Sequence, residues 1–395
     1  MREMFLIDTH KYSYIIIKNN ERYQDAMNST FFFLILLWYS AGNGQGSASQ
    51  ESSEIALRMD SLFQVLSARE GFNGNVLIAK AGKVIYKKTF GYADLKLKTP
   101  LNIKSVFQIG SITKQFTAMA IMMLHDEGKL NFTDPVQLFF PKFPYNNITI
   151  HQLLSHRSGL PEYMRFAKRY WKNNKKPMRN TDLMNIMIEY RPTLVFAPDE
   201  EYYYSNTGYV VLACIIEHVS GISYSAFLEK HIFKPLGMKM SFVSNKKKIE
   251  DVKYPTVGYK QNKRRATEDY LSGTVGDKGI YSTVEDMLKW DQCLYTEKLV
   301  RQSTLQEAFT PFSYDKQNEK NYGYGWRIET SNNGDKIVYH AGWWRGYSSL
   351  FVRRLADKSV VIILCNKVNT SYEDVDLLMS IIDSSKQDSA ISDSD

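Results

Sequence analysis

A serine and a lysine three residues apart stand at the start of an apolar stretch, FQIGSITKQFTAMAIMML (107–124). On a helix this spacing places both side chains on one face, so the amine of Lys114 can reach the hydroxyl of Ser111. A hydroxyl attacks at neutral pH when a neighbouring base takes its proton, and an amine in an apolar site can serve. The same spacing occurs at Ser244 and Ser313, but both lie in polar, loop-like segments. The setting therefore predicts Ser111 as the reactive serine.

A second stretch carries groups that an acyl-transfer site needs. Tyr204 and Asn206 stand immediately before a strongly apolar segment, TGYVVLACIIE. A lysine ammonium favours the anion of a neighbouring phenol, so Tyr204 can share the role of general base. The amide of Asn206 can orient an ester or amide substrate. The Tyr-x-Asn spacing recurs at Tyr145, and Asn206 would also suit a helix N-cap, so both interpretations remain open.

The third stretch, HAGWWRGYSSLFVRR, begins at His340 and contains the one His-x-Gly of the sequence. A strand that ends here could pair with the backbone of a substrate, and Gly342 would allow a close approach. The N–H of Trp343 and that of Ser111, at a helix start, could then bind a developing oxyanion. The alternative is that His340 is an ordinary histidine at a strand end.

The secondary structure expected to position these residues differs from one part of the chain to another. Residues 51–70 have helical spacing, and residues 74–94 alternate like a β-hairpin with a turn at Ala81–Gly82. A helix is expected from about Ser111 to Glu127, followed by mostly helical segments, and strands dominate from Gly323. The two ends must meet to complete one antiparallel sheet with a helical region inserted. This pattern predicts an α+β fold with a binding cleft at the seam.

Composition and charge narrow the function. The chain has 395 residues, 44% hydrophobic and 23% charged, which is typical of a globular protein. Its net charge of +8 includes seven basic residues between 165 and 179 and nine between 239 and 265. These clusters fit solvated loops, or an attraction for anionic substrates or an anionic envelope surface; no motif indicates nucleic-acid binding. The cysteines and histidines have no metal-ligand spacing, so buried thiols and no metal or organic cofactor are expected.

The first 48 residues are predicted to be a signal peptide or N-terminal extension. FFFLILLWYSAG (31–42) is short for a membrane span and fits a signal core, and Ala48 is a candidate cleavage position. We therefore expect export to the periplasm or the cell exterior and no stable membrane span; a short membrane-anchoring segment is the alternative. Residues 49–383 are predicted to form the catalytic domain, and the Ser/Asp-rich residues 384–395 a disordered tail.

Taken in order, Ser-x-x-Lys, Tyr-x-Asn and His-x-Gly resemble the three motifs of the serine beta-lactamase and penicillin-binding-protein superfamily. The most similar branch contains class C beta-lactamases, D-alanyl-D-alanine carboxypeptidases and related serine esterases. Surrounding segments such as LLSHRSGLPEY and YGYGW extend the resemblance over residues 53–383. The resemblance implies Ser111 as the acylated nucleophile, Lys114 as its proton partner and Tyr204 as the base. It implies substrate contacts for the remaining candidates, Asn206, His340, Gly342 and Trp343, the last through its oxyanion N–H.

His340 stands where beta-lactamases usually carry a lysine, and this departure bears on the substrate. An imidazole with a pKa of about 6.5 is mostly neutral at pH 7, so carboxylate-bearing beta-lactams lose an attraction that neutral esters do not need. Lowering the pH from about 8 to 6 would then favour carboxylate-bearing substrates. Arg345 is a candidate for the missing cation. His156 is expected to bond the loop at its helix end.

The resulting hypothesis is a serine hydrolase that acts through an acyl-enzyme on esters or amides. Within it, carboxylesterase, D-amino-acid peptidase and weak beta-lactamase activities compete. The substrate would be a small ester, peptide or beta-lactam, including cell-wall peptides. The alternative is a penicillin-binding sensor or wall-interacting protein that is acylated without turnover.

Overall fold

The computed structural model describes residues 46–392 except 174, 316–319, 332, 370, 371 and 373. The described residues from Glu51 onward form one compact unit. The predicted signal core at 31–42 lies outside the described residues and stays a prediction. Within the described part of the chain, no single helix is long and apolar enough to cross a membrane; Asn206–Ser220 and Tyr224–Leu236 pass that test together, with a bend of 76°.

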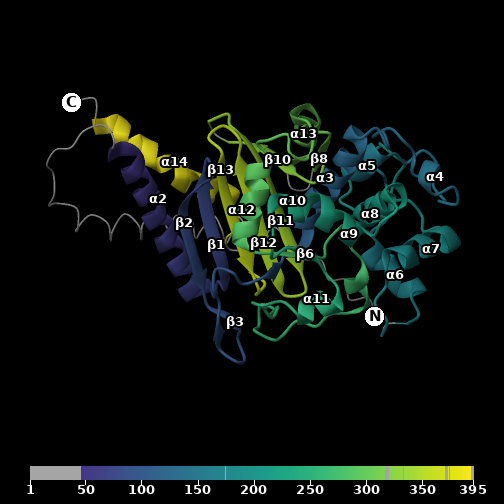
Figure 1. Cartoon of the computed structure of the whole chain (residues 1–395), viewed down its shortest axis with the longest axis horizontal. Helices are drawn as coiled ribbons and strands as arrows, with labels where there is room; N and C mark the ends of the chain where they lie inside the picture. Colours follow the sequence, from purple (N-terminus) through teal and green to yellow (C-terminus); the bar gives the residue numbers. More distant parts are fainter. Residues whose placement is uncertain are drawn as a thin grey trace, which may run out of the picture. The chain divides into compact units, whose positions relative to one another are not determined.

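The centre of the fold is an antiparallel sheet of eight strands in the order β2-β1-β13-β12-β11-β10-β9-β8 (Figure 1). Its first strands, β1 (Gly74–Lys80) and β2 (Lys83–Phe90), pair beside the late strand β13 (Ser359–Cys365), with Val76 opposite Ile363. The other strands are β12 (Tyr347–Arg354), β11 (Lys336–Trp344), β10 (Arg327–Thr330), β9 (Lys320–Tyr322) and β8 (Ser313–Asp315). The prediction that the two ends of the chain complete one sheet is confirmed.

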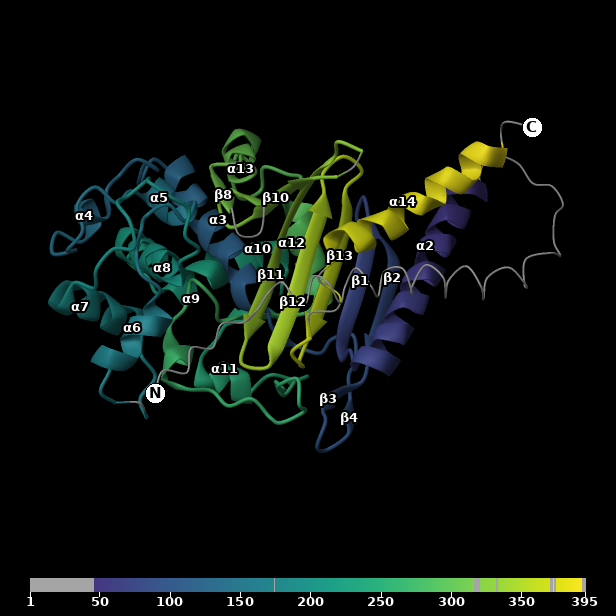
Figure 2. The ribbon, with the colours of Figure 1, turned by 180° about the vertical axis from the view of Figure 1, so that it is seen from behind.

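Both faces of this sheet are covered, because alternate residues of its central strands face different hydrophobic clusters. Leu77 and Ile362 belong to the larger cluster, with the inserted helices, whereas Val76 and Ile363 belong to the smaller one. Figure 2 shows α2 (Gly46–Val65) and α14 (Val375–Ser392) on the face of the smaller cluster. These layers confirm the α+β fold.

The inserted region contains most of the helices and two small sheets. Its helices are α3 (Thr113–Asp126), α4 (Val136–Phe139), α5 (Ile150–Leu154), α6 (Tyr163–Tyr170), α7 (Asn180–Tyr190), α8 (Asn206–Ser220), α9 (Tyr224–Leu228), α10 (Lys234–Leu236), α11 (Lys246–Glu250), α12 (Val284–Cys293) and α13 (Gln302–Ala308). The small sheets pair β3 (Tyr92–Asp94) with β4 (Thr99–Pro100), and β7 (Ile280–Ser282) with β5 (Phe107–Gln108) and β6 (Phe242–Val243).

Local expectations and outcomes differ at two places. The helix expected from Ser111 begins instead with a 3₁₀ turn, Gly110–Ile112, and becomes α-helical at Thr113. The segment Ser313–Asp315, expected as a loop, is an edge strand. Helix α14, expected at 371–383, extends to Ser392; the disordered tail expected for residues 384–395 stays a prediction. The predicted turn at Ala81–Gly82 is present, with φ of 47° and 79°, and all three cysteines are buried.

Candidate active site

The turn that carries Ser111 is pressed against strand β11. Gly110 has φ +52°, and a Cβ atom added to it would lie 2.5 Å from the backbone nitrogen of Trp343. A Cβ atom on Gly342 would lie 2.1 Å from the carbonyl oxygen of Ile109. Glycine is therefore required at both positions by the contact between two backbones. On the side of Gly342 where a Cβ atom would stand, the segment leading to the serine fills the space, and the predicted role of Gly342 in substrate approach stays a prediction.

Lys114 is the centre of the polar site. Its side chain is buried, and its Nζ donates to three oxygens: Ser111 Oγ at 3.1 Å, Asn206 Oδ1 at 2.7 Å and the backbone carbonyl of Asp277 at 2.9 Å. Three acceptors match the three N–H bonds of an ammonium group. The predicted contact between Ser111 and Lys114 is present. Ser313, a rival serine, donates instead to the carbonyl of Ser155.

Tyr204 lies next to this amine within an aromatic cluster. Lys114 Nζ is 4.8 Å from the centroid of the Tyr204 ring. The ring of His156 packs against the same ring in a tilted arrangement, at 4.3 Å between centroids. His156 Nδ1 accepts from the backbone N–H of Ser205, and its carbonyl accepts from the N–H of Tyr203. The segment carrying Tyr204 is thus held on both sides by one residue. The loop-bonding role expected for His156 agrees with these contacts.

Asn206 is the first residue of α8, and its side chain does not cap that helix. Its Oδ1 accepts from Lys114, while its Nδ2 and its backbone N–H both donate to Glu162 Oε2, at 3.0 and 2.9 Å. Glu162 Oε1 accepts from the N–H of Met164. Burial raises the pKa of this carboxyl above its usual value, and the backbone N–H groups that it accepts oppose the shift. The N-cap alternative for the Asn206 side chain is therefore not what the geometry shows.

His340 lies on β11 with 2% of its surface exposed, and both ring nitrogens have partners. Nδ1 is 2.6 Å from the carbonyl of Ala341, which can only accept, so Nδ1 carries the proton and Nε2 accepts from the hydroxyl of Tyr322 at 3.0 Å. Burial holds the pKa of His340 well below its usual value, and the charges of Lys114 and Arg327 lower it further. This direction agrees with the neutral imidazole expected near pH 7, and it favours a neutral ring down to about pH 6 as well. Its substrate contact stays a prediction.

The backbone N–H of Trp343 points toward the site for a topological reason. Arg345 and Gly346, both with positive φ, form the two-residue turn between β11 and β12, which makes Trp344 and Tyr347 the first hydrogen-bonded pair. Trp343 is one residue further from the turn, so its N–H faces the other edge of β11. Pairing with β10 extends along β11 to Tyr339. The side chain of Trp343 is 53% exposed.

Two groups of this site were not predicted from the sequence: the carbonyl of Asp277, which binds Lys114, and Glu162, which binds Asn206. The Asp277 acceptor is a backbone carbonyl, which has no residue-type signature, although the glycines around it in GTVGDKGI signalled a tight loop. Glu162 lies in the segment LPEY and could have been suspected as a lone acid in an apolar setting. Arg345, considered as a replacement cation, pairs with Asp269 and lies over the ring of Trp344.

Comparisons with known proteins identify relatives of this chain. Residues 59–383 match the family described as Beta-lactamase. The chain is 36% identical over 329 residues to penicillin-binding protein 4* of Bacillus subtilis (strain 168), covering 80% of this chain and 73% of the relative. It is similar to the solved octameric penicillin-binding protein homologue from Pyrococcus abyssi, with TM-score 0.71, 30% identity and coverage of 78% and 73%. The D-amino acid amidase from Ochrobactrum anthropi SV3 shares the fold, with TM-score 0.66, 21% identity and coverage of 87% and 99%.

Proposed function

The chain belongs to the beta-lactamase family, and we propose that it is a serine hydrolase acting through an acyl-enzyme at Ser111. The single observation that carries this proposal is the contact of Lys114 Nζ with Ser111 Oγ at 3.1 Å, in an amine held by two further acceptors. Members of this family are typically serine hydrolases, which supports the same reaction class.

In the proposed reaction, Ser111 Oγ attacks the carbonyl carbon of an ester or amide. Because the three N–H bonds of Lys114 are already directed at oxygens, Lys114 stabilises the attacking oxygen as a cation. Tyr204, reacting as the anion that this ammonium favours, takes the proton and becomes a neutral phenol. The N–H groups of Ser111 and Trp343 bind the oxyanion. Tyr204 returns the proton to the leaving alcohol or amine, and an acyl ester on Ser111 remains. Attack by water, with its proton passing through Tyr204, releases the acid.

We propose esters and D-amino-acid amides or peptides as the substrate class, with weak turnover of beta-lactams. The neutral, buried His340 offers no charge to a substrate carboxylate, and Arg345 is engaged by Asp269. Losing a charge-assisted contact typically costs about 1.5–3 kcal/mol. A neutral acyl donor needs no such contact. The named D-amino acid amidase among the neighbours in fold is compatible with this class.

Intact-protein mass spectrometry tests the proposal. Wild type and Ser111→Ala are incubated with a fluorophosphonate, a penicillin and a D-alanyl ester, and the labelled peptide is sequenced. A label on Ser111 with all three reagents, with release of product from the ester, is expected. A label at Ser244 or Ser313, or an equally labelled Ser111→Ala, would overturn the assignment.

The same experiment separates a second candidate, a penicillin-binding sensor that is acylated without turnover. The relative from Bacillus subtilis carries the name penicillin-binding protein, which favours this candidate. A penicillin adduct that persists, together with no steady-state product from the ester, would identify a sensor. Repeated turnover of the ester would identify a hydrolase.

A further inference from the structure

The loop from Thr274 to Gly279, which supplies the Asp277 carbonyl to Lys114, is tied to the helix that carries Lys114. Thr117 Oγ1 donates to the carbonyl of Gly276 at 2.7 Å, and the N–H of Ile280 donates to Thr113 Oγ1 at 3.2 Å. Gly276 and Gly279 have φ of 104° and 102°, and a Cβ atom on Gly276 would lie 2.6 Å from the carbonyl of Tyr209. The loop therefore has little room to move away from α3.

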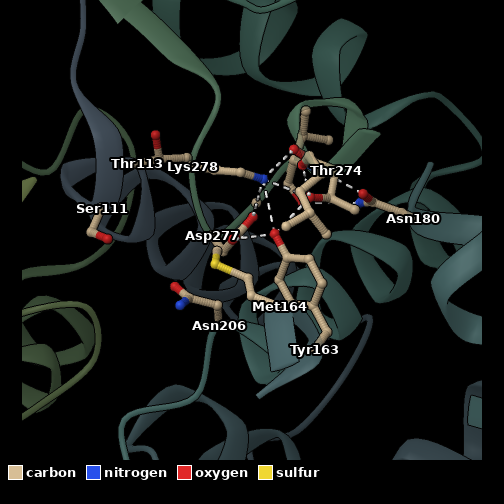
Figure 3. Close-up of polar contacts among 12 residues, drawn as sticks. Ser111, Thr113, Tyr163, Met164, Asn180, Asn206, Thr274, Asp277 and Lys278 are labelled. Carbon is tan, nitrogen blue, oxygen red and sulfur yellow. Dashed lines mark hydrogen bonds and ion pairs between the residues drawn. The ribbon is translucent and has the colours of Figure 1, made fainter. Parts of the chain in front are cut away.

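A buried ion pair lies directly behind this carbonyl. Asp277 and Lys278 are 0% and 3% exposed, but Lys278 Nζ and Asp277 Oδ1 are 3.6 Å apart, beyond hydrogen-bonding distance. The phenol of Tyr163 joins them: its oxygen accepts from Lys278 at 2.9 Å and donates to Asp277 Oδ2 at 3.0 Å. Figure 3 shows Tyr163 and Lys278 directed toward Thr274 and Asp277. Lys278 completes its bonds on the hydroxyl and the carbonyl of Thr274.

Glu162, the residue before Tyr163, also holds a group that binds Lys114. Glu162 accepts from both N–H groups of Asn206, whose Oδ1 is the second oxygen bound to Lys114. Tyr163 holds Asp277, whose carbonyl is the third. Two consecutive residues at the start of α6 therefore position two of the three acceptors of the amine. The first acceptor, Ser111 Oγ, is the nucleophile itself.

We propose that Glu162 and Tyr163, with the Asp277–Lys278 pair behind them, are positioning residues that aim Lys114 at Ser111. This inference rests on the proposed roles of Ser111 and Lys114. Rigid stability alone does not require such a pair, because a buried ion pair can often be replaced by apolar residues at little cost in stability. The orientation of Lys114 toward Ser111 is a different requirement, because small displacements of a reacting group change rates strongly.

Tyr163→Phe removes the bridging oxygen and keeps the ring. The matched control is Tyr145→Phe, which removes another buried phenol oxygen in the helical region, one that donates to the carbonyl of Pro192. In the full chain, the rate of labelling of Ser111 by a fluorophosphonate is resolved into kinact and KI. Tyr163→Phe should lower kinact about tenfold and leave KI within about twofold, while Tyr145→Phe changes neither.

A second pair of variants addresses Glu162. Glu162→Gln retains a carbonyl oxygen for the two N–H groups of Asn206, whereas Glu162→Ala removes it. We expect kinact to fall further in Glu162→Ala than in Glu162→Gln at equal thermal stability. If wild type is labelled at Ser111 and Tyr163→Phe and Glu162→Ala are labelled as fast, the positioning role is overturned and the proposed function stands. If wild type itself is not labelled, both fall.

Discussion

Two buried ion pairs in this protein differ in what they connect. Asp277 and Lys278 are bridged by Tyr163 and lie behind a carbonyl that binds Lys114. Asp291 and Arg353 join α12 to β12, with a direct bond of 2.7 Å from Nε to Oδ1. The Arg353 guanidinium is 4.5 Å from the centroid of the Tyr295 ring, so aromatic surface replaces further oxygen partners.

The first pair therefore belongs to the proposed catalytic site, and the second belongs to the scaffold. The first pair reaches the proposed catalytic amine through one backbone carbonyl, and any disturbance there changes the geometry around Ser111. In the second pair, the guanidinium of Arg353 lies against the rings of Tyr295, Phe309 and Trp326, which support the sheet. Loss of one partner from either pair leaves a buried charge. Rates should respond to the first pair and stability to both.

The largest effect is expected at the centre of the first region. Ser111→Ala should lower kcat/KM for an activated ester by about 10⁴-fold or more, because the nucleophile is lost. Both ion pairs remain intact, so the melting temperature should stay close to that of wild type. Steady-state kinetics and thermal melts on the same preparation measure both quantities. Turnover near the wild-type value would contradict the assignment.

Tyr204→Phe sharpens the same distinction with a smaller change. The ring still packs on His156, so unfolding should be almost unaffected. Loss of a general acid–base group typically lowers kcat by about 10²–10⁴-fold. Single-turnover acylation and deacylation rates will show which step depends on the phenol. A variant within about threefold of wild type would mean that Lys114 acts without it.

Asp291→Asn disrupts the second ion pair, where we expect a loss of stability and little change in rate. It leaves the Arg353 charge buried without its counter-ion, which typically costs about 3–5 kcal/mol of the free energy of unfolding. The kcat of the folded fraction should stay within about twofold of wild type. Urea unfolding and active-site titration measure the two effects. A large fall in kcat per active site would show that the scaffold pair also controls the reaction.

A pH dependence of stability should come from His156 and His340. Burial lowers the pKa of both in the folded protein, with Lys114 and Arg327 facing both rings and His340 also facing His156. The unfolded chain therefore binds more protons below about pH 6.5, and stability present above that pH is lost as the pH falls. Each ring contributes about 1.4 kcal/mol per pH unit in that range.

Urea titrations between about pH 7.5 and 5 measure the slope of the free energy of unfolding against pH. His340→Gln should lower this slope by the contribution of one proton. The same burial predicts that the preference between carboxylate-bearing and neutral substrates stays constant from about pH 8 to 6. A preference that rises toward pH 6 would indicate that the ring of His340 becomes charged when substrate binds.

Much of the fold was readable from the sequence because its signals are local. The hairpin of residues 74–94, the helix after Ser111 and the late strands each carry their own periodicity and turn residues. Helix breaks were harder to locate: Gly221, with φ of 71°, ends α8 where the apolar pattern continued. The edge strand at Ser313 was missed because its polar residues have no strand alternation, and pairing with β9 creates it.

By itself the sequence determined the residue types that can react and their order, since Ser111, Lys114, Tyr204 and Asn206 occupy motifs with fixed spacing. Only the tertiary structure decided how each is held. The third acceptor of Lys114 is a backbone carbonyl brought from Asp277, 163 positions away. The buried, neutral state of His340 depends on Tyr322 and on packing that no local pattern encodes. Hydrogen bonds and burial depend on distances in space, and spacing along the chain specifies those distances only within one element.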